Sequence, residues 1–256
     1  MVLGASEGLG AAYAHGLAAR GLNVVLAARR ADLLQRVAED VAHQHGVETR
    51  AVTLDLAASE LLAVLQAQTD ELDVGFVVYN GASGYVGPMR DQGVDSLRSI
   101  IAVNCTGPLN VCHHFGARMI DQGRGGIVLM GSAAGLAGAA YNSAYAASKA
   151  FDIVLGEALW AEWRNLNVDV ISVIGPAIDT PNYRAASSLD GGSMPKPMAP
   201  AAVVEEVLDA LGSTPSLVPG ERVRNMLAML GALPRRDQVE ALSAAHEAFA
   251  ERSHTV

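Results

Sequence analysis

The sequence predicts an α/β protein in which helices cover both faces of a parallel sheet. Apolar runs of four to six residues alternate with amphipathic segments of helical length along the whole chain, as in strands joined by crossover helices. Half of the residues are hydrophobic, 26 are glycine and 5% are aromatic, which suits helices packed closely on a sheet. A chain of 256 residues is long enough for one domain with a large core. We therefore expect a single doubly wound domain over residues 1–256.

Seven short apolar runs are the expected strands of a sheet of about seven strands. They cover residues 2–3, 23–27, 48–54, 74–79, 126–130, 169–174 and 216–218, with helices expected between them. After the sixth run, residues 175–200 contain prolines at 176, 181, 195 and 197 and a small, polar run at 187–193. Irregular segments of this length are commonly functional lids, so we expect a substrate lid over about 175–200. A helical C-terminal segment is expected over about 221–252, with a last helix from about 235 that packs on the body or on a neighbouring subunit.

The charge balance argues against partners that are polyanions. Acidic residues outnumber basic ones by 27 to 18, and the pI is near 5.2, whereas nucleic acids and anionic membranes need a basic surface. The sequence contains no apolar run of transmembrane length and no signal peptide, so we expect a cytoplasmic protein. Cys105 and Cys112 lie in an expected helix, about 10 Å apart along its axis, which is too far for a disulfide. No metal site is expected, because neither cysteine has a histidine or cysteine at ligand spacing.

A glycine-rich turn at residues 3–10 follows the first expected strand and opens a helix. Exposed N–H groups and the helix dipole at such a turn can hold a pyrophosphate, although a purely structural strand-to-helix turn has the same glycines. Glu7 places a negative charge inside the turn and weakens the case for phosphate. The expected contacts to a dinucleotide are Gly4, Ser6, Glu7, Gly8, Leu9 and Gly10.

The end of the second expected strand bears on the choice between NAD and NADP. An acidic residue here accepts the adenosine ribose hydroxyls, whereas a basic residue accommodates a 2′-phosphate. Ala28 occupies the acidic position, and Arg29 and Arg30 follow it. NADP(H) is therefore favoured over NAD, unless the two arginines only form the solvated start of the next helix.

Tyr145 and Lys149 lie four residues apart in an expected helix, so their side chains leave the same face one turn apart. A tyrosine hydroxyl ionises only at about pH 10, and a nearby cation makes it a better acid or base near neutrality. An isolated pair with this spacing is more often a half-buried tyrosine and a solvated lysine. The other motifs of the chain change that balance.

Together these motifs resemble the short-chain dehydrogenases/reductases of the short type, over nearly the whole chain. The family's Gly-x-x-x-Gly-x-Gly signature is met by Gly4, Gly8 and Gly10. The later motifs of the family are matched by Asp55 with Leu56, by Asn80, Gly81 and Ala82, by Asn104, by Ser132, by Tyr145 thirteen residues after that serine, and by Lys149. Gly81–Ala82 and Gly175–Pro176 interchange the order of residues found in the family, and Thr180 keeps its place after the second of these pairs. Taken singly, each of these residues has a structural explanation. Asn104 could cap or kink its helix, Ser132 could be a turn residue, and Asp55 could be a helix cap.

The resemblance implies a Rossmann-like fold and an NAD(P)-dependent oxidoreductase that interconverts a ketone or aldehyde and an alcohol. It implies that Tyr145 is the acid or base, that Ser132 holds the substrate oxygen, and that Lys149 stabilises the phenolate and binds the nicotinamide ribose. Asn104 would order a water molecule. The remaining implied cofactor contacts are Arg29, Arg30, Asp55, Leu56, Asn80, Gly81, Ala82, Pro176, Ile178 and Thr180. The resemblance also implies a homodimer or homotetramer joined through the helices that bear Asn104 and Tyr145.

The substrate and the start of the chain are less legible. Residues 133–144 are nearly all small and apolar, which favours a roomy pocket for a hydrophobic ketone, aldehyde, secondary alcohol or acyl thioester, or else tight packing of this loop. A catalytically silent dinucleotide-binding sensor or scaffold is the alternative from another class, and an epimerase or dehydratase is a third reading. Only Met1, Val2 and Leu3 precede the first glycine of the turn, so we expect that the true start lies upstream or that the chain was trimmed.

Overall fold

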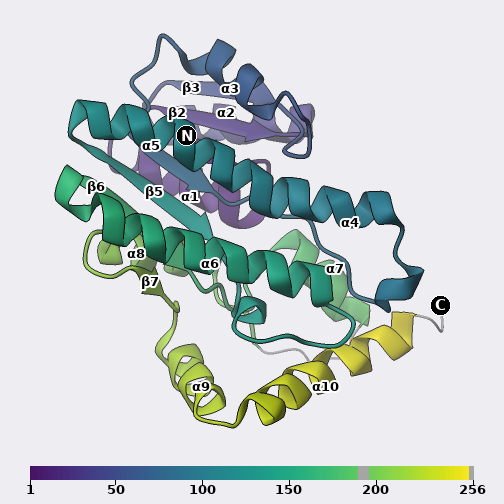
Figure 1. Ribbon diagram of the computed structural model, residues 1–256. Helices are drawn as coiled ribbons and strands as arrows, with labels where there is room; N and C mark the ends of the chain where they lie inside the picture. Colours follow the sequence, from purple (N-terminus) through teal and green to yellow (C-terminus); the bar gives the residue numbers. More distant parts are fainter. Residues whose placement is uncertain (190–195, 254–256) are drawn as a thin grey trace.

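The computed structural model describes residues 1–189 and 196–253 (Figure 1). In the described part of the chain, seven parallel strands form one sheet in the order β3-β2-β1-β4-β5-β6-β7. The strands are β1 Val2–Leu3, β2 Val24–Ala28, β3 Thr49–Thr53, β4 Phe76–Tyr79, β5 Gly125–Met130, β6 Val168–Val173 and β7 Ser216–Leu217. All seven predicted strands are confirmed, and their ends differ from the prediction by at most two residues.

Helices cover both faces of this sheet, as a doubly wound α/β fold requires (Figure 1). The helices are α1 Gly8–Ala18, α2 Ala31–His45, α3 Leu61–Thr69, α4 Val94–Ile101, α5 Gly107–Gln122, α6 Ser143–Trp163, α7 Pro181–Leu189, α8 Pro200–Ala210, α9 Glu221–Gly231 and α10 Arg235–Ser253. Buried side chains of α3, α5 and α6 form one core with the sheet, and those of α1, α2 and α8 form the other. This arrangement confirms the predicted fold class.

The central strands β1, β2 and β4 are continuous apolar runs, because both faces of the sheet are buried there, whereas β3 at the edge is only partly buried. In β1, Val2 belongs to the core under α1 and Leu3 to the core under α5, and both are fully buried. In β2, Leu26 likewise belongs to the core under α1, and Ala27 belongs to the core under α5. A two-residue strand at the centre of the sheet is therefore packed on both sides.

The order of strands reverses between β1 and β4, and this point places the functional crevice. Strands to one side of β1 follow as β2 and β3, whereas those to the other side follow as β4 to β7. Ligands of doubly wound sheets bind at such a switch point, beyond the carboxyl ends of the strands. Here the Leu3 carbonyl accepts hydrogen bonds from the backbone N–H groups of Asn80, at 3.0 Å, and Gly81, at 2.9 Å, so the turns after β1 and β4 are held together.

The lid expected over about 175–200 was predicted to be irregular, and this was wrong for part of it. Helix α7 begins at Pro181, where the missing N–H and fixed φ of proline suit the first helical position. Thr180 precedes it, and its hydroxyl accepts a hydrogen bond from the Tyr183 N–H at 3.2 Å. Pro181 is one of the four prolines in the segment that was expected to be irregular, and it starts a helix. Residues 190–195, which include part of the small polar run and Pro195, lie outside the described residues.

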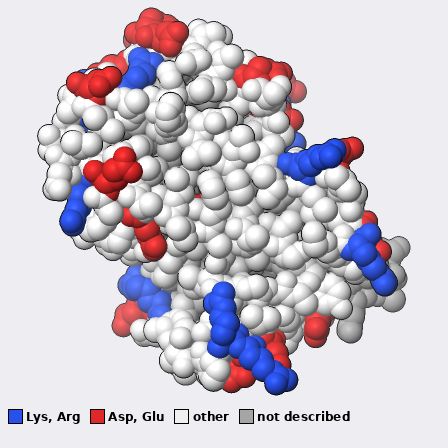
Figure 2. All heavy atoms as spheres, viewed as in Figure 1, with Lys and Arg blue, Asp and Glu red and all other residues white. Residues whose placement is uncertain are grey.

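The surface over α5 and α6 carries few charges. Figure 2 shows charged side chains toward the edges of this face and an uncharged area at its centre. Several large apolar side chains of α4, α5 and α6 are exposed here, including Ile101, Leu109 and Val154. Within residues 1–189 and 196–253, no helix has the length and apolar character needed to cross a membrane.

Candidate active site

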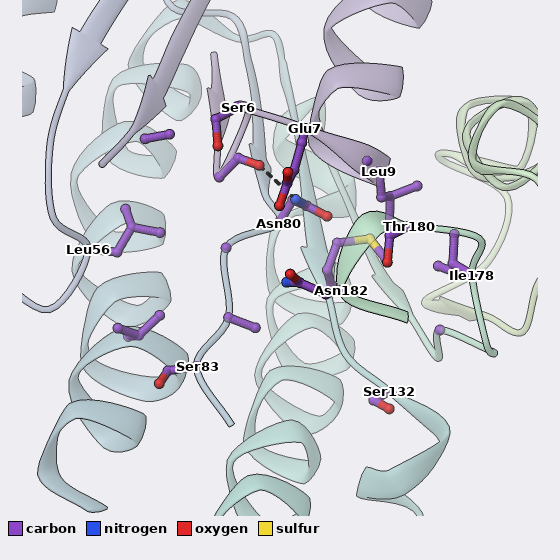
Figure 3. A pocket seen from close by; sticks show the side chains of 18 of the residues that line it. Ser6, Glu7, Leu9, Leu56, Asn80, Ser83, Ser132, Ile178, Thr180 and Asn182 are labelled. Atoms are coloured by element: carbon purple, nitrogen blue, oxygen red, sulfur yellow. Dashed lines mark hydrogen bonds between the residues drawn. The ribbon is translucent and has the colours of Figure 1, made fainter. Parts of the chain in front are cut away.

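A crevice of about 570 Å³ opens at the carboxyl ends of the strands, around the switch point (Figure 3). Figure 3 shows Ser6 and Glu7 at one end, Ser132 toward the other, Leu56 and Ser83 on one wall, and Ile178 and Thr180 on the opposite wall. The predicted site residues that line it are Gly4, Ser6, Glu7, Gly8, Leu9, Arg29, Arg30, Asp55, Leu56, Asn80, Gly81, Ala82, Ser132, Tyr145, Lys149, Pro176, Ile178 and Thr180. Gly10 and Asn104 were predicted as well, and they do not line it.

The glycine turn is packed directly on the turn that follows β4. Gly4 has a φ of +83°, and a Cβ on it would lie 2.6 Å from the Gly81 Cα, so a side chain fits neither the backbone conformation nor the space. A Cβ on Gly10 would lie 2.0 Å from the Gly4 carbonyl oxygen. Gly10 therefore acts from behind the crevice, by letting α1 approach the turn. The Asn80 side chain ties the two turns together by donating to the Gly4 carbonyl at 3.0 Å (Figure 3).

An ion pair occupies the end of the crevice beside β2. The Arg30 guanidinium lies 2.6 Å from a Glu7 carboxylate oxygen and donates to the Ser6 hydroxyl at 3.0 Å. Both members are partly exposed, Arg30 at 51% and Glu7 at 26% of their side-chain surface. Arg29 lines the same end. Glu7 therefore engages a cation that borders the predicted phosphate site, a contact that the sequence did not predict.

Tyr145 and Lys149 come together at the other end of the crevice, on α6. The Lys149 Nζ lies 5.9 Å from the centre of the Tyr145 ring, and the lysine side chain is only 3% exposed. Two of the three donors of Nζ are satisfied by the Met130 carbonyl at 2.7 Å and by an Asp152 carboxylate oxygen at 2.9 Å. The ammonium therefore lies beneath the tyrosine with fixed partners.

Ser132 stands at the end of β5, and its side chain faces the crevice (Figure 3). Its hydroxyl oxygen accepts a hydrogen bond from the Ala134 N–H at 3.2 Å, as a turn residue would. Accepting this bond does not use the hydroxyl proton. Ser132 can therefore stabilise the turn and still donate to an oxygen bound in the crevice.

Asn104 lies below the crevice in a π-helical segment, Ala102–Thr106, between α4 and α5, and it is fully buried. Its side chain donates to the Ser83 carbonyl at 2.8 Å and to the Ser148 hydroxyl at 2.9 Å, and it accepts from the Ser83 N–H at 2.8 Å. All of these side-chain contacts are to Ser83 and Ser148, and the expected role of Asn104 in ordering a water molecule stays a prediction. Asn104 braces the loop after β4 against α6, and π-helical turns such as this one are frequent at functional sites.

Residues 1–189 match the family described as short chain dehydrogenase. The chain belongs to this family. A 7beta-hydroxysteroid dehydrogenase of Collinsella aerofaciens is 31% identical over 228 residues, which cover 87% of this chain and 86% of that protein. A structure from a study of 7beta-hydroxysteroid dehydrogenase stereoselectivity has a TM-score of 0.87 at 26% identity, covering 94% of this chain and 95% of that one. A short-chain dehydrogenase from Sphingobium yanoikuyae in complex with NADPH has a TM-score of 0.77 at 26% identity, covering 90% and 91%.

This short-chain dehydrogenase is thus an oxidoreductase that interconverts a carbonyl and an alcohol. The family binds NAD(P), and a crevice lined by glycines at one end and by cations at both ends fits a nucleotide of this size and charge. No three His, Cys, Asp or Glu side chains among residues 1–189 and 196–253 gather in an arrangement that would hold a metal ion.

Sequence reasoning missed several residues that line the crevice of the dehydrogenase. They are Ser83, Ser99, Val103, Met130, Gly131, Ala177, Asn182 and Tyr183. Asn182 and Tyr183 lie on α7, and the Thr-Pro pair at 180 and 181 was the signal that could have placed them on a helix. Asp152 was also missed, although its position three residues after Lys149 is a helical contact spacing.

The small apolar loop between Ser132 and Tyr145 is held by the C-terminal helix of the dehydrogenase. The Ala140 N–H donates to the Ser243 hydroxyl at 2.9 Å, and the Arg235 guanidinium donates to the Leu136 carbonyl at 2.8 Å. Tyr141 adopts a φ of +63°, which a residue with a Cβ adopts only where its surroundings hold it. Helix α10 therefore braces the wall of the predicted substrate pocket.

Proposed function

We propose that this dehydrogenase prefers NADP(H) and interconverts a bulky hydrophobic ketone and its secondary alcohol, with Tyr145 exchanging the proton. The observation that carries the proposal is the meeting of Tyr145, Lys149 and Ser132 at one end of the crevice that begins at the glycine turn. A bound nicotinamide supplies the hydride chemistry. The chain supplies the groups that orient the substrate oxygen and give or take its proton.

Three side chains divide this work. Tyr145 donates a proton to the oxygen in reduction and accepts it in oxidation. Ser132 donates a hydrogen bond to the same oxygen and so stabilises the negative charge that develops on it. Lys149 is held by the Met130 carbonyl and Asp152. Its charge stabilises the phenolate, and its third N–H donates a hydrogen bond to the nicotinamide ribose.

The preference for NADP(H) is supported by the charges at the far end of the crevice. Ala28 leaves the end of β2 without a carboxylate, and Arg29 and Arg30 line the adjacent wall, so a 2′-phosphate would meet cations there. Asp55 and Leu56 would contact the adenine. Ile178 and Thr180 would hold the carboxamide, together with Pro176, on the wall opposite Leu56 (Figure 3).

A hydroxysteroid is the substrate class that the relatives suggest, since 7beta-hydroxysteroid dehydrogenases match most of the chain. The small apolar residues after Ser132 support an apolar substrate of this kind, because they leave room beside the catalytic groups. Arg184 of α7 is paired with Asp179 at 2.6 Å, so its charge is engaged within the chain, which also favours an apolar substrate. An acyl thioester remains the second class to assay.

We also propose that the dehydrogenase is a homodimer or homotetramer joined through the face of α5 and α6. The uncharged centre of this face (Figure 2) and the exposure of Val154 at 63% and Leu109 at 47% support it, because apolar patches of this kind are usually covered. Light scattering of the purified protein measures the assembly, and a monomer at micromolar concentration would contradict it.

Tyr145→Phe tests the catalytic assignment. The variant is expected to bind NADPH as the wild type does, by quenching of protein fluorescence, and to lose activity by about 10²- to 10⁴-fold, because general acid–base catalysis contributes that much. Activity is read by absorbance over a panel of ketones and alcohols with NADPH and NADH in parallel. Tyr85→Phe is the matched control, since Tyr85 does not line the crevice. Near-normal turnover in Tyr145→Phe would end the assignment.

A further inference from the structure

A buried carboxylate holds the lysine that lies beneath Tyr145. Asp152 follows Lys149 by three residues on α6, and its Oδ2 lies 2.9 Å from Nζ. The two side chains are 4% and 3% exposed. The other oxygen, Oδ1, is buried without a hydrogen-bond partner among the described residues. A buried carboxylate with one unpartnered oxygen is costly, so packing alone does not explain an aspartate at this position.

The groups that face Asp152 from neighbouring elements carry no charge, so Lys149 is its counter-ion. Burial raises the pKa of Asp152, and Lys149 is the cation that acts against this rise. Tyr79 of β4 donates its hydroxyl proton to the Val103 carbonyl at 2.6 Å. Burial raises the pKa of the Cys112 thiol to about 12 and also raises that of Cys105, and Asp152 adds to both effects. These neighbours are therefore neutral, and the lysine and the aspartate form one isolated ion pair.

This ion pair bears on Tyr145 because the three residues share one side of α6. Tyr145 and Asp152 are seven residues apart, which is about two helical turns and about 10 Å along the axis. A negative charge at that distance opposes ionisation of the phenol. For an effective dielectric constant between that of a protein surface and that of water, the effect corresponds to roughly 0.3 to 1.2 pH units.

We propose that Asp152 is a positioning residue for this reaction, which fixes the Lys149 ammonium under Tyr145 and raises the pH at which Tyr145 loses its proton. The protonated phenol is the form that acts as the acid in carbonyl reduction. Asp152 thereby extends the pH range of reduction upward, at the expense of alcohol oxidation. This inference rests on the proposed roles of Tyr145 and Lys149.

Asp152→Asn in the full-length chain tests the proposal, because it keeps the shape and removes the charge. The ionisation of Tyr145 is followed by tyrosinate absorbance, with a Tyr145→Phe background subtracted for each protein, and by the pH profile of kcat/KM for alcohol oxidation. The midpoint is expected to fall by roughly 0.3 to 1.2 pH units. A midpoint that stays in place overturns the proposal, even if activity falls at every pH, since Asp152 would then be structural only. A midpoint that rises overturns it as well, since Asp152 would then act by maintaining the Lys149 cation and not by opposing ionisation of Tyr145.

Three further proteins make the result interpretable. Asp121→Asn removes the same charge from an exposed position near the C-terminal end of α5. It is expected to leave the midpoint unchanged. Asp152→Glu keeps the charge and is expected to stay near the wild-type midpoint. If Asp152→Asn does not fold by circular dichroism, Asp152→Leu is the second neutral variant, and the same midpoint decides. The absorbance titration needs no turnover, so a wild type without activity on any substrate would sink the proposed function and leave this result standing.

Discussion

The two ends of the crevice each hold a carboxylate against a cation, and the two ion pairs differ in burial. At the β2 end, Glu7 and Arg30 are partly exposed, whereas at the α6 end Lys149 and Asp152 are almost fully buried. An exposed pair typically contributes about 0 to 1 kcal/mol, so the proposed 2′-phosphate would have little to overcome in displacing Glu7. Removing one member of a buried pair costs about 3 to 5 kcal/mol, because the other charge is left unpaired. We therefore expect an exchangeable contact at the β2 end and a permanent one at the α6 end.

Removing the buried cation should have the largest effect. Lys149→Met is expected to lower the free energy of unfolding by about 3 to 5 kcal/mol at neutral pH, because it leaves the Asp152 carboxylate unpaired. The loss should shrink as the pH falls, since the pKa of Asp152 is already raised by burial and protonation removes the stranded charge. Urea unfolding at several pH values measures this.

The double variant Lys149→Met/Asp152→Leu separates stability from activity. It is expected to recover most of the stability, because apolar side chains often replace a buried ion pair without loss. Activity should stay as low as in Lys149→Met, since the phenolate still lacks its cation. If Lys149→Met has the same free energy of unfolding as the wild type, the buried pair is not the permanent contact described above.

A new charge at the exposed end should have an intermediate effect, on affinity alone. Ala28→Asp places a carboxylate at the end of β2 beside Arg29 and Arg30, and it is expected to weaken NADPH binding at least about tenfold while favouring NADH. Fluorescence titrations with both cofactors measure the change. Ala31→Asp adds the same charge at the exposed start of α2 and should leave the ratio of the two affinities near that of the wild type. An unchanged preference in Ala28→Asp would refute the assignment of this end to the 2′-phosphate.

The sequence predicted those features that depend on residues close together along the chain. The central strands are buried on both faces and are continuous apolar runs, so their prediction has a direct physical reason. The glycine turn and the Tyr145–Lys149 spacing are short motifs, and the structure places both on one crevice. These features depend on residues that are close along the chain.

Contacts between segments that are distant in the sequence could not be predicted in this way. Asn104 meets Ser83 and Ser148, which are 21 and 44 residues away, so its bracing position could not be read from its own neighbourhood. The same holds for Arg30, whose pairing with Glu7 depends on how β2 and the glycine turn meet. Helix α7 was missed for a different reason, because Pro181 is compatible with both a loop and a helix start.

Glu7→Gln should have the smallest effect and is the sharpest probe of the exchangeable pair. It frees Arg30 from a competing carboxylate, so NADPH binding is expected to tighten by up to about fivefold, in line with the ~0.2 to 1 kcal/mol typical of an exposed pair. NADH binding should change little, and the free energy of unfolding should stay within about 0.5 kcal/mol of the wild type. Glu205→Gln is the matched control, since it breaks the exposed pair with Arg20, at 3.0 Å on the α1 and α8 side, away from the crevice. Weaker NADPH binding in Glu7→Gln would mean that Glu7 holds Arg30 in place for the phosphate, and that the exposed pair acts as a support, as the buried one does.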